Sequence, residues 1–246
     1  MWAAYPLLRR EYANISVQLT YDEKRFHDRV DSVDSDTRKT LGVWTLGMSG
    51  NRTDGWAGGG TDLFSFNIVS GHLGLDATAA AIDAGEGGHR TAGRYEKFVL
   101  SYSRTQRITE QVFLYASLTG QLTNRNLDTS EGQALGGAYG IRAYPQDEGL
   151  GNDAALLNLE FRWEVPDVPH VQTIAFVDAG AVRVNHSPLP TDTHNRRYLA
   201  GEGFGVRWMG SNRFCVNSYL AWRSGPEPLS DIDRRPRAWV QFIQYF

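Results

Sequence analysis

Residues 153–164 read D-A-A-L-L-N-L-E-F-R-W-E, a stretch in which apolar and polar side chains alternate. One face carries Ala155, Leu157, Leu159, Phe161 and Trp163, and the other carries Asn158, Glu160, Arg162 and Glu164. Successive side chains of a β-strand point to opposite faces, so this stretch predicts a strand that is apolar on one side only. The apolar face spans about 9–11 residues, which is the length of a tilted transmembrane strand.

The same alternation recurs along the chain, clearly in residues 14–21, 111–123 and 213–223. It predicts about ten antiparallel strands and an all-β protein. The predicted strands are 13–24, 38–49, 60–71, 93–104, 110–123, 153–164, 171–184, 198–209, 212–223 and 237–246. Trp163 and Trp222 stand at strand ends, where aromatic residues gather in membrane barrels.

The predicted connections alternate in length. The long ones are 25–37, 72–92, 124–152, 185–197 and 224–236, and the shorter ones are 50–59, 105–109, 165–170 and 210–211. Long loops on one side and short turns on the other are typical of outer-membrane β-barrels. With the C-terminus on the short-turn side, residues 124–152 lie on the cell-surface side. Ala77–Ala84 has the composition of a short surface helix.

Composition limits the protein class. The 246 residues suit one domain, with 41% hydrophobic residues and a mean hydropathy of -0.41. No run approaches the roughly 18 apolar residues of a spanning helix, which leaves a barrel possible. A net charge of -3 gives no electrostatic case for nucleic acid. The single cysteine, Cys215, excludes an internal disulfide. The start is no signal peptide, so we expect a removed signal or a fragment.

Two short stretches carry the candidate chemistry. Residues 133–144 read Q-A-L-G-G-A-Y-G-I-R-A-Y, inside a connection of about 29 residues, and residues 176–180 read F-V-D-A-G. Arg142 in the connection and Asp178 on a polar strand face can form a charge-assisted contact. That contact would tether the connection inside a barrel as a plug; the alternative is a solvated loop arginine. Glycines that permit positive φ and close backbone approach are Gly136, Gly137 and Gly140.

These stretches resemble the barrel of two-partner-secretion transporters, the haemolysin secretion/activation proteins. Residues 5–10 (Y-P-L-L-R-R), 120–121 (G-Q) and 135–145 also contribute to the resemblance. The loop motif of that superfamily is V/I-R-G-Y/F, and three of its four positions match at Ile141, Arg142 and Tyr144, with Ala143 replacing glycine. The strand motif F-x-D-x-G is complete at Phe176, Asp178 and Gly180.

The resemblance implies a sixteen-stranded barrel preceded by two periplasmic domains that bind the substrate. Five strands follow the motif loop in that family, and five are predicted to follow it here. Residues 1–246 are therefore expected to be the C-terminal portion of the barrel, without the periplasmic domains. The last strand, with Phe242 and the terminal Phe246, resembles the C-terminal signal of outer-membrane proteins, although Gln244 departs from it.

The predicted function is that of a non-enzymatic outer-membrane translocator for a haemolysin- or adhesin-type exoprotein. The predicted partners are that exoprotein, outer-membrane lipid or lipopolysaccharide, and the barrel assembly machinery. The alternatives are an assembly barrel that inserts other barrels, a soluble ligand-binding barrel and an outer-membrane hydrolase. A hydrolase would use His186 with Asp192, or Asp231 and Asp233, but no G-x-S-x-G motif is present. The six histidines share no metal-ligand spacing, so no metal or cofactor is expected.

Overall fold

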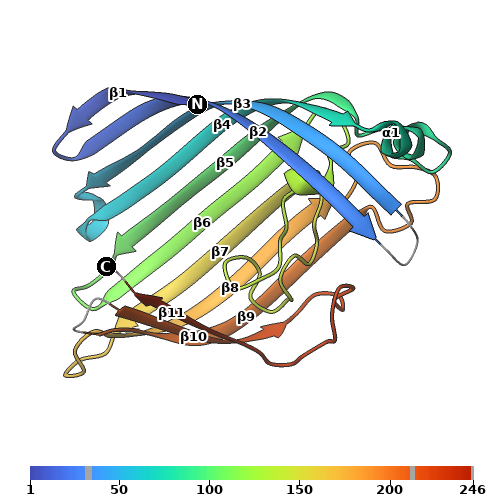
Figure 1. The fold of residues 1–246 in the computed structure, drawn as a ribbon. Helices are drawn as coiled ribbons and strands as arrows, with labels where there is room; N and C mark the ends of the chain where they lie inside the picture. The colour runs from blue at the N-terminus through green and yellow to red at the C-terminus, as the bar shows by residue number, and fades with distance from the viewer. Residues whose placement is uncertain (31–34, 211–213, 245–246) are drawn as a thin grey trace.

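A computed structural model describes residues 1–30, 35–210 and 214–244. The chain forms one antiparallel sheet in which each strand pairs with its neighbours in sequence. Figure 1 shows this sheet curling around a central space. The strands are β1 Trp2–Arg10, β2 Ala13–Val30, β3 Ser35–Asp54, β4 Gly60–Leu75, β5 Gly93–Arg107, β6 Val112–Thr123, β7 Asp153–Glu164, β8 Val171–Arg183, β9 Arg196–Met209, β10 Phe214–Arg223 and β11 Arg237–Gln244. The all-β prediction is confirmed.

The described residues contain eleven strands, one more than the ten predicted ranges. The missed strand is β1, which pairs with β2 from Trp2↔Thr20 to Arg10↔Ala13. Its register shifts between Pro6 and Leu8. Proline lacks the N–H that a sheet ladder needs and is tolerated on an edge strand or at an irregularity. β1 contains Pro6 and lacks a regular alternation of apolar and polar residues, so its sequence did not predict a strand.

The predicted long connection 25–37 is also wrong. β2 and β3 continue through most of it and pair as far as Val30↔Ser35. Polar residues occupy both faces of this extension, so it lacks apolar alternation even though its backbone ladder is complete. The connection between β4 and β5 is long, and it contains the expected helix α1 (Ala77–Ala84), capped by the Asp76 side chain. Short turns follow β3, β5 and β7 at the opposite end of the sheet.

The outer face of the curved sheet carries an exposed apolar band. Its members are 39–65% exposed and come from β2 to β11; they include Leu19, Trp44, Leu46, Met48, Ile68, Phe98, Leu100, Leu118, Leu122, Leu157, Leu159, Phe161, Val177, Phe204, Val206, Trp208, Leu220 and Phe242. Soluble monomers rarely expose a contiguous apolar surface of this extent. An outward apolar band is what a transmembrane barrel presents to lipid. In the described part of the chain, no helix is long and apolar enough to cross a membrane.

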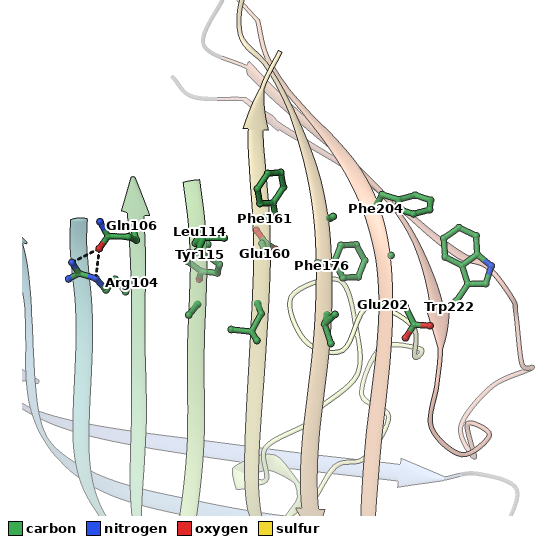
Figure 2. A pocket seen from close by; sticks show the side chains of 15 residues that line it. Arg104, Gln106, Leu114, Tyr115, Glu160, Phe161, Phe176, Glu202, Phe204 and Trp222 are labelled. Carbon is green, nitrogen blue, oxygen red and sulfur yellow. Dashed lines mark hydrogen bonds between the residues drawn. The ribbon is translucent and has the colours of Figure 1, made fainter. Parts of the chain in front are cut away.

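A groove of about 830 Å³ lies in this outer face across β5 to β10. Figure 2 shows Phe161, Phe204 and Trp222 around it, with Arg104 and Gln106 at its far end. Glu202 is an exposed carboxylate in the band and lies opposite Trp222 in the register. The groove is on the face of the wall that points away from the segment between β6 and β7, which occupies the central space.

The inner face packs against that segment, residues 124–152, called the motif loop below. Two apolar clusters form there. The larger joins loop residues Leu135, Ile141 and Tyr144 to the inner faces of β7 to β10. The smaller packs loop residue Leu127 against β3, β4 and β5. The core therefore lies between the motif loop and the wall, so both packing and polar contacts hold the loop.

Candidate functional site

The motif loop turns back into the space enclosed by the sheet instead of projecting from its edge (Figure 1). Leu135, Ile141 and Tyr144 near its tip are completely buried, at 0% exposure. The prediction that residues 124–152 fold inward is confirmed. The loop comes from the end of the sheet opposite the short turns.

Arg142, at the loop tip, contacts Asp178 on the inner face of β8. Its Nη2 lies 2.7 Å from Asp178 Oδ1 and its Nε 2.9 Å from Oδ2. The backbone N–H of Arg142 also donates to Oδ2, over 3.0 Å. Arg142 is 4% exposed and Asp178 is 0% exposed. The structure therefore brings the two residues together as a bidentate, buried ion pair, and the solvated-arginine alternative does not hold.

Glu160 on β7 is a second carboxylate at the same guanidinium. Arg142 Nη1 lies 2.6 Å from Glu160 Oε1, and Arg162 Nη2 lies 2.7 Å from Oε2. The Arg142 guanidinium also lies 3.5 Å from the centre of the Phe176 ring and 5.0 Å from that of Tyr219. Cation–π attraction and two carboxylates thus compensate a charge that burial alone would disfavour.

Burial and the two carboxylates act in opposite directions on the pKa of Arg142. Burial acts to lower the pKa of Arg142, but the bonds and charges of Asp178 and Glu160 outweigh it, so the pKa is raised.

Sequence analysis placed Glu160 and Arg162 only on a polar strand face. Their position two residues apart on that face, opposite the loop, was the available clue.

The backbone on either side of Arg142 is held from two strands. Asn158 on β7 donates its amide to Gly140 O over 2.9 Å and to Asp178 Oδ1 over 2.8 Å. Trp239 on β11 donates its indole N–H to Arg142 O over 2.7 Å. The loop tip is therefore fixed through main chain as well as side chain, and the last strand takes part in holding it.

Small residues make room for this close approach. Gly137 has a φ of 119°, and a Cβ at Gly140 would clash with Leu135 O. A Cβ at Gly180 on β8 would come 3.1 Å from Ile141 Cδ1. The strand motif thus supplies a ring below the guanidinium at Phe176, its carboxylate at Asp178, and space for the loop at Gly180.

Ala143 fits where the family motif has glycine. It is 4% exposed and is not among the described non-glycine residues with positive φ. Its methyl group faces Gly201 on β9, where an added Cβ would clash with it. The missing glycine is therefore accommodated by a glycine on the facing strand.

The first limb of the motif loop has its own anchor, which sequence analysis missed. Glu131 is 6% exposed, and its carboxylate lies 2.9 Å from both Lys24 Nζ on β2 and Lys97 Nζ on β5. Asp128 lies 3.1 Å from Lys39 Nζ on β3. The three lysines point to the inner face of their strands, so charge complementarity extends along the whole limb.

The second limb is anchored by Glu148, which is 1% exposed. Its carboxylate pairs with Arg197 on β9 and accepts the Ser230 hydroxyl. It also accepts the N–H groups of Leu229 and Ser230, over 3.0 and 2.9 Å. Tyr144 donates its hydroxyl to Pro226 O, at 2.7 Å. The motif loop is thereby fastened to the connection between β10 and β11.

Loop docking should weaken in acid. Burial acts to raise the pKa of Glu148, but hydrogen bonds from Ser230, Leu229 and Arg197 outweigh it. Burial likewise acts to raise the pKa of Glu131, but the charges and hydrogen bonds of Lys97 and Lys24 outweigh it. Both pKa values therefore lie below the ordinary 4.5. A lowered carboxyl pKa stabilises the docked state above pH 4.5, and that contribution is lost as the pH falls through the lowered value.

The pH dependence of loop docking can be measured by amide hydrogen exchange of residues 124–152 between pH 6 and 3, corrected for intrinsic exchange rates. We expect protection to fall below pH 4.5, and to fall less steeply when both Glu131 and Glu148 are glutamine. Protection that is constant across this range would contradict the assignment of these two anchors.

The remaining candidate residues lie apart from this site. Phe242 is outward and 65% exposed on β11, and Phe246 lies outside the described residues. His186 contacts Asp153 and not Asp192, which contacts His89 instead. Among the described residues, no group of three or more His, Cys, Asp or Glu is placed to hold a metal ion.

Comparison with known proteins gives a consistent family. The model of the haemolysin secretion/activation protein family ShlB/FhaC/HecB matches residues 2–208. The Outer membrane transporter CdiB of Dickeya dadantii is 28% identical over 176 residues, covering 68% of this chain and 30% of CdiB. The Heme/hemopexin transporter protein HuxB of Haemophilus influenzae is 20% identical over 251 residues, covering 98% and 43%.

A solved structure shares the fold. CdiB from Escherichia coli superposes with a TM-score of 0.56 at 17% identity, covering 98% of this chain and 51% of that chain. The chain thus spans less than half the length of the curated relatives it matches.

Proposed function

Because the chain belongs to the haemolysin secretion/activation protein family ShlB/FhaC/HecB, we propose that it is part of an outer-membrane transporter for two-partner secretion. In this proposal residues 1–246 form the C-terminal portion of a sixteen-stranded barrel. An unfolded exoprotein passes through the barrel, past the motif loop. The observation that carries the proposal is the buried contact of Arg142 with Asp178, which holds that loop in the space that the curved sheet encloses.

The two faces of the sheet support a location in the outer membrane. The outer face presents the exposed apolar band to lipid, and the inner face carries buried polar and charged side chains. Inner polar groups that contact the docked motif loop include Asn158, Glu160 and Asp178. A translocating chain would therefore compete with the motif loop for the polar groups on the inner face of the sheet, which can bind both main chain and side chains.

We infer from the same geometry how the path would open. The loop has three anchors, at Glu131, Arg142 and Glu148, and each contacts different strands. Freeing the loop tip breaks the central pair, while the two limbs keep the loop attached to the wall. We propose that the central anchor sets the resting, closed state and that the limbs limit how far the loop moves.

The type of exoprotein, a haemolysin or an adhesin, is part of this proposal, as are the partners in the membrane. Those partners are outer-membrane lipid or lipopolysaccharide, and the assembly machinery that inserts the barrel. The family match and the named transporters CdiB and HuxB support secretion over barrel assembly.

A secretion assay tests the proposal. In a strain that lacks the chromosomal gene for this protein, a plasmid copy of the gene should restore release of the exoprotein that is encoded beside it. We expect the exoprotein to have an N-terminal secretion domain of the haemagglutinin type. Unchanged exoprotein release in the deletion strain, together with loss of other barrels from the outer membrane, would replace secretion by barrel assembly as the function.

A further inference from the structure

A second groove crosses the outer face, on the loop side of the apolar band and over β2 to β5. Its volume is about 820 Å³. We call it the rim groove, and the residues that matter here are Tyr21, Arg25, Gly42, Trp44, His72 and Arg94. It lies near the strand ends that lead into the long connections, because His72 and Arg94 stand within three residues of the ends of β4 and β5.

Two aromatic rings mark the border between the rim groove and the apolar band. Tyr21 and Trp44 face each other across β2 and β3, with ring centres 4.9 Å apart. Next to them on the same face, toward the short turns, are Leu19 and Leu46, which are 44% and 47% exposed. Aromatic residues of membrane barrels gather at the membrane–water interface. The rim groove therefore lies at the level of lipid headgroups.

The strand register places charged groups of the rim groove in one row. Glu23, Gly42, His72 and Arg94 stand opposite one another on consecutive strands. Gly42 has no side chain, and the Tyr21 ring lies over this position, where an added Cβ would come 3.2 Å from the Tyr21 hydroxyl oxygen. Arg25 projects from β2 on the same face as Glu23, two residues further toward the rim.

The basic groups at the rim groove have free donors. In the part of the chain that the structure describes, the side chains of His72 and Arg94 make no hydrogen bond or ion pair. Arg25 donates Nε and Nη2 to one oxygen of Glu23, at 2.8 and 2.6 Å, and its side chain is 78% exposed. A guanidinium has five donors in a planar fork, a shape that matches phosphate oxygens.

The opposite end of the same strands provides a contrast. Arg104 on β5 is also on the outer face, but its guanidinium is bound by Asp54 at 3.0 Å and by Asp62 at 2.9 Å. Its donors are thus used within the protein. Arginines on the outer face therefore do not all have unused N–H donors. Those at the rim groove do, and they lie beside the aromatic border.

We propose that the rim groove binds the phosphorylated sugar headgroup of a glycolipid in the outer leaflet. Arg25 and Arg94 hold the phosphates, and the acyl chains lie along the apolar band below Trp44. Glu23 competes with phosphate for Arg25 and so limits affinity. The inference rests on the outer-membrane location proposed above, but not on secretion. It assigns a lipid site to side chains that face away from the motif loop, although the main-chain oxygen of Arg94 accepts a hydrogen bond from Arg125 of that loop, over 2.8 Å.

Binding of fluorescent bisphosphorylated lipid A to the purified protein in detergent tests this site. The double variant Arg25→Gln/Arg94→Gln should bind at least tenfold more weakly. Arg52→Gln is the matched control, because Arg52 is exposed on the same face of β3 at the opposite end. We expect that control to bind as the unchanged protein does. Glu23→Gln should bind more tightly, because it removes the competing carboxylate.

Three results would overturn the proposal. One is equal lipid A affinity in the double variant and the unchanged protein. Another is an equal loss in Arg52→Gln, which would mean non-specific charge attraction. The third is displacement of lipid A by an equimolar amount of inorganic phosphate. The assay contains no exoprotein, so failure here and failure of the secretion assay are separate results.

Discussion

Replacing Asp178 by asparagine should release the tip of the motif loop while leaving the strands intact. The substitution keeps the shape of the side chain but leaves the Arg142 guanidinium with Glu160 as its nearest carboxylate. Removing one partner of a buried ion pair costs about 3–5 kcal/mol. A change of that size shifts the equilibrium between docked and released loop by a factor of about 100 or more. We expect this to be the largest effect of any single substitution considered.

Trypsin offers a direct readout, because it cleaves after arginine and Arg142 is 4% exposed in the docked loop. Cleavage after Arg142 should be fast in Asp178→Asn and slow in the unchanged protein. Exoprotein secretion should fall, with insertion into the outer membrane retained. Asp147→Asn is the control, since Asp147 is an exposed carboxylate in the same loop. Equal protection of Arg142 in both variants would show that Asp178 does not hold the loop.

The second large effect is expected for Glu148→Gln. The carboxylate is buried, pairs with Arg197 and accepts two backbone N–H groups from the connection between β10 and β11. Its loss leaves Arg197, whose side chain is only 12% exposed, without its carboxylate. We expect a cost of about 3 kcal/mol to loop docking. The second limb and the β10–β11 connection should loosen together.

Hydrogen exchange at Leu229 and Ser230 measures this, because their amides donate to Glu148. Exchange at both should rise about 100-fold, which corresponds to about 2.7 kcal/mol. Glu227→Gln is the matched control on the same connection, since Glu227 is 78% exposed beside Arg223. Arg223 keeps Asp233 as a carboxylate partner at 2.7 Å in this variant, and the Glu227 carboxylate is solvated, so little change is expected there. The same small change in both variants would remove Glu148 from the list of anchors.

Sequence reasoning found the parts of the fold in which one face of a strand is apolar and the other polar. β7 was predicted with its observed bounds, because its alternation is complete from Asp153 to Glu164. β1 and the far ends of β2 and β3 were missed for the same physical reason. Their backbones are paired in the sheet, with a register shift in β1 between Pro6 and Leu8, but their side chains carry no two-faced pattern. Apolar alternation marks the part of a strand that faces lipid, and the far ends of β2 and β3 extend beyond the apolar band.

The candidate site was only partly accessible to such reasoning. Arg142 and Asp178 have opposite charges and lie in two recognisable motifs, and the structure places them in contact. Glu131, Glu148 and Glu160 belong to the same arrangement, but the contacts of these three residues between loop and wall, or between loop and the β10–β11 connection, join residues 18 to 107 positions apart in sequence. Nothing local marks a carboxylate as an anchor, because only the folded loop brings it to the wall.

A double-mutant cycle on Arg142 and Asp178 tests the central claim most directly, namely that this contact holds the motif loop inside the barrel. Loop docking is measured by hydrogen exchange at Ile141 and Tyr144, whose amides bond within the loop itself. Arg142→Gln and Asp178→Asn should each reduce protection strongly, and the double variant should be little worse than either. We predict a coupling energy of at least about 1.5 kcal/mol. Losses that add to within about 0.5 kcal/mol would show that the residues act independently and would contradict the tethered-loop account.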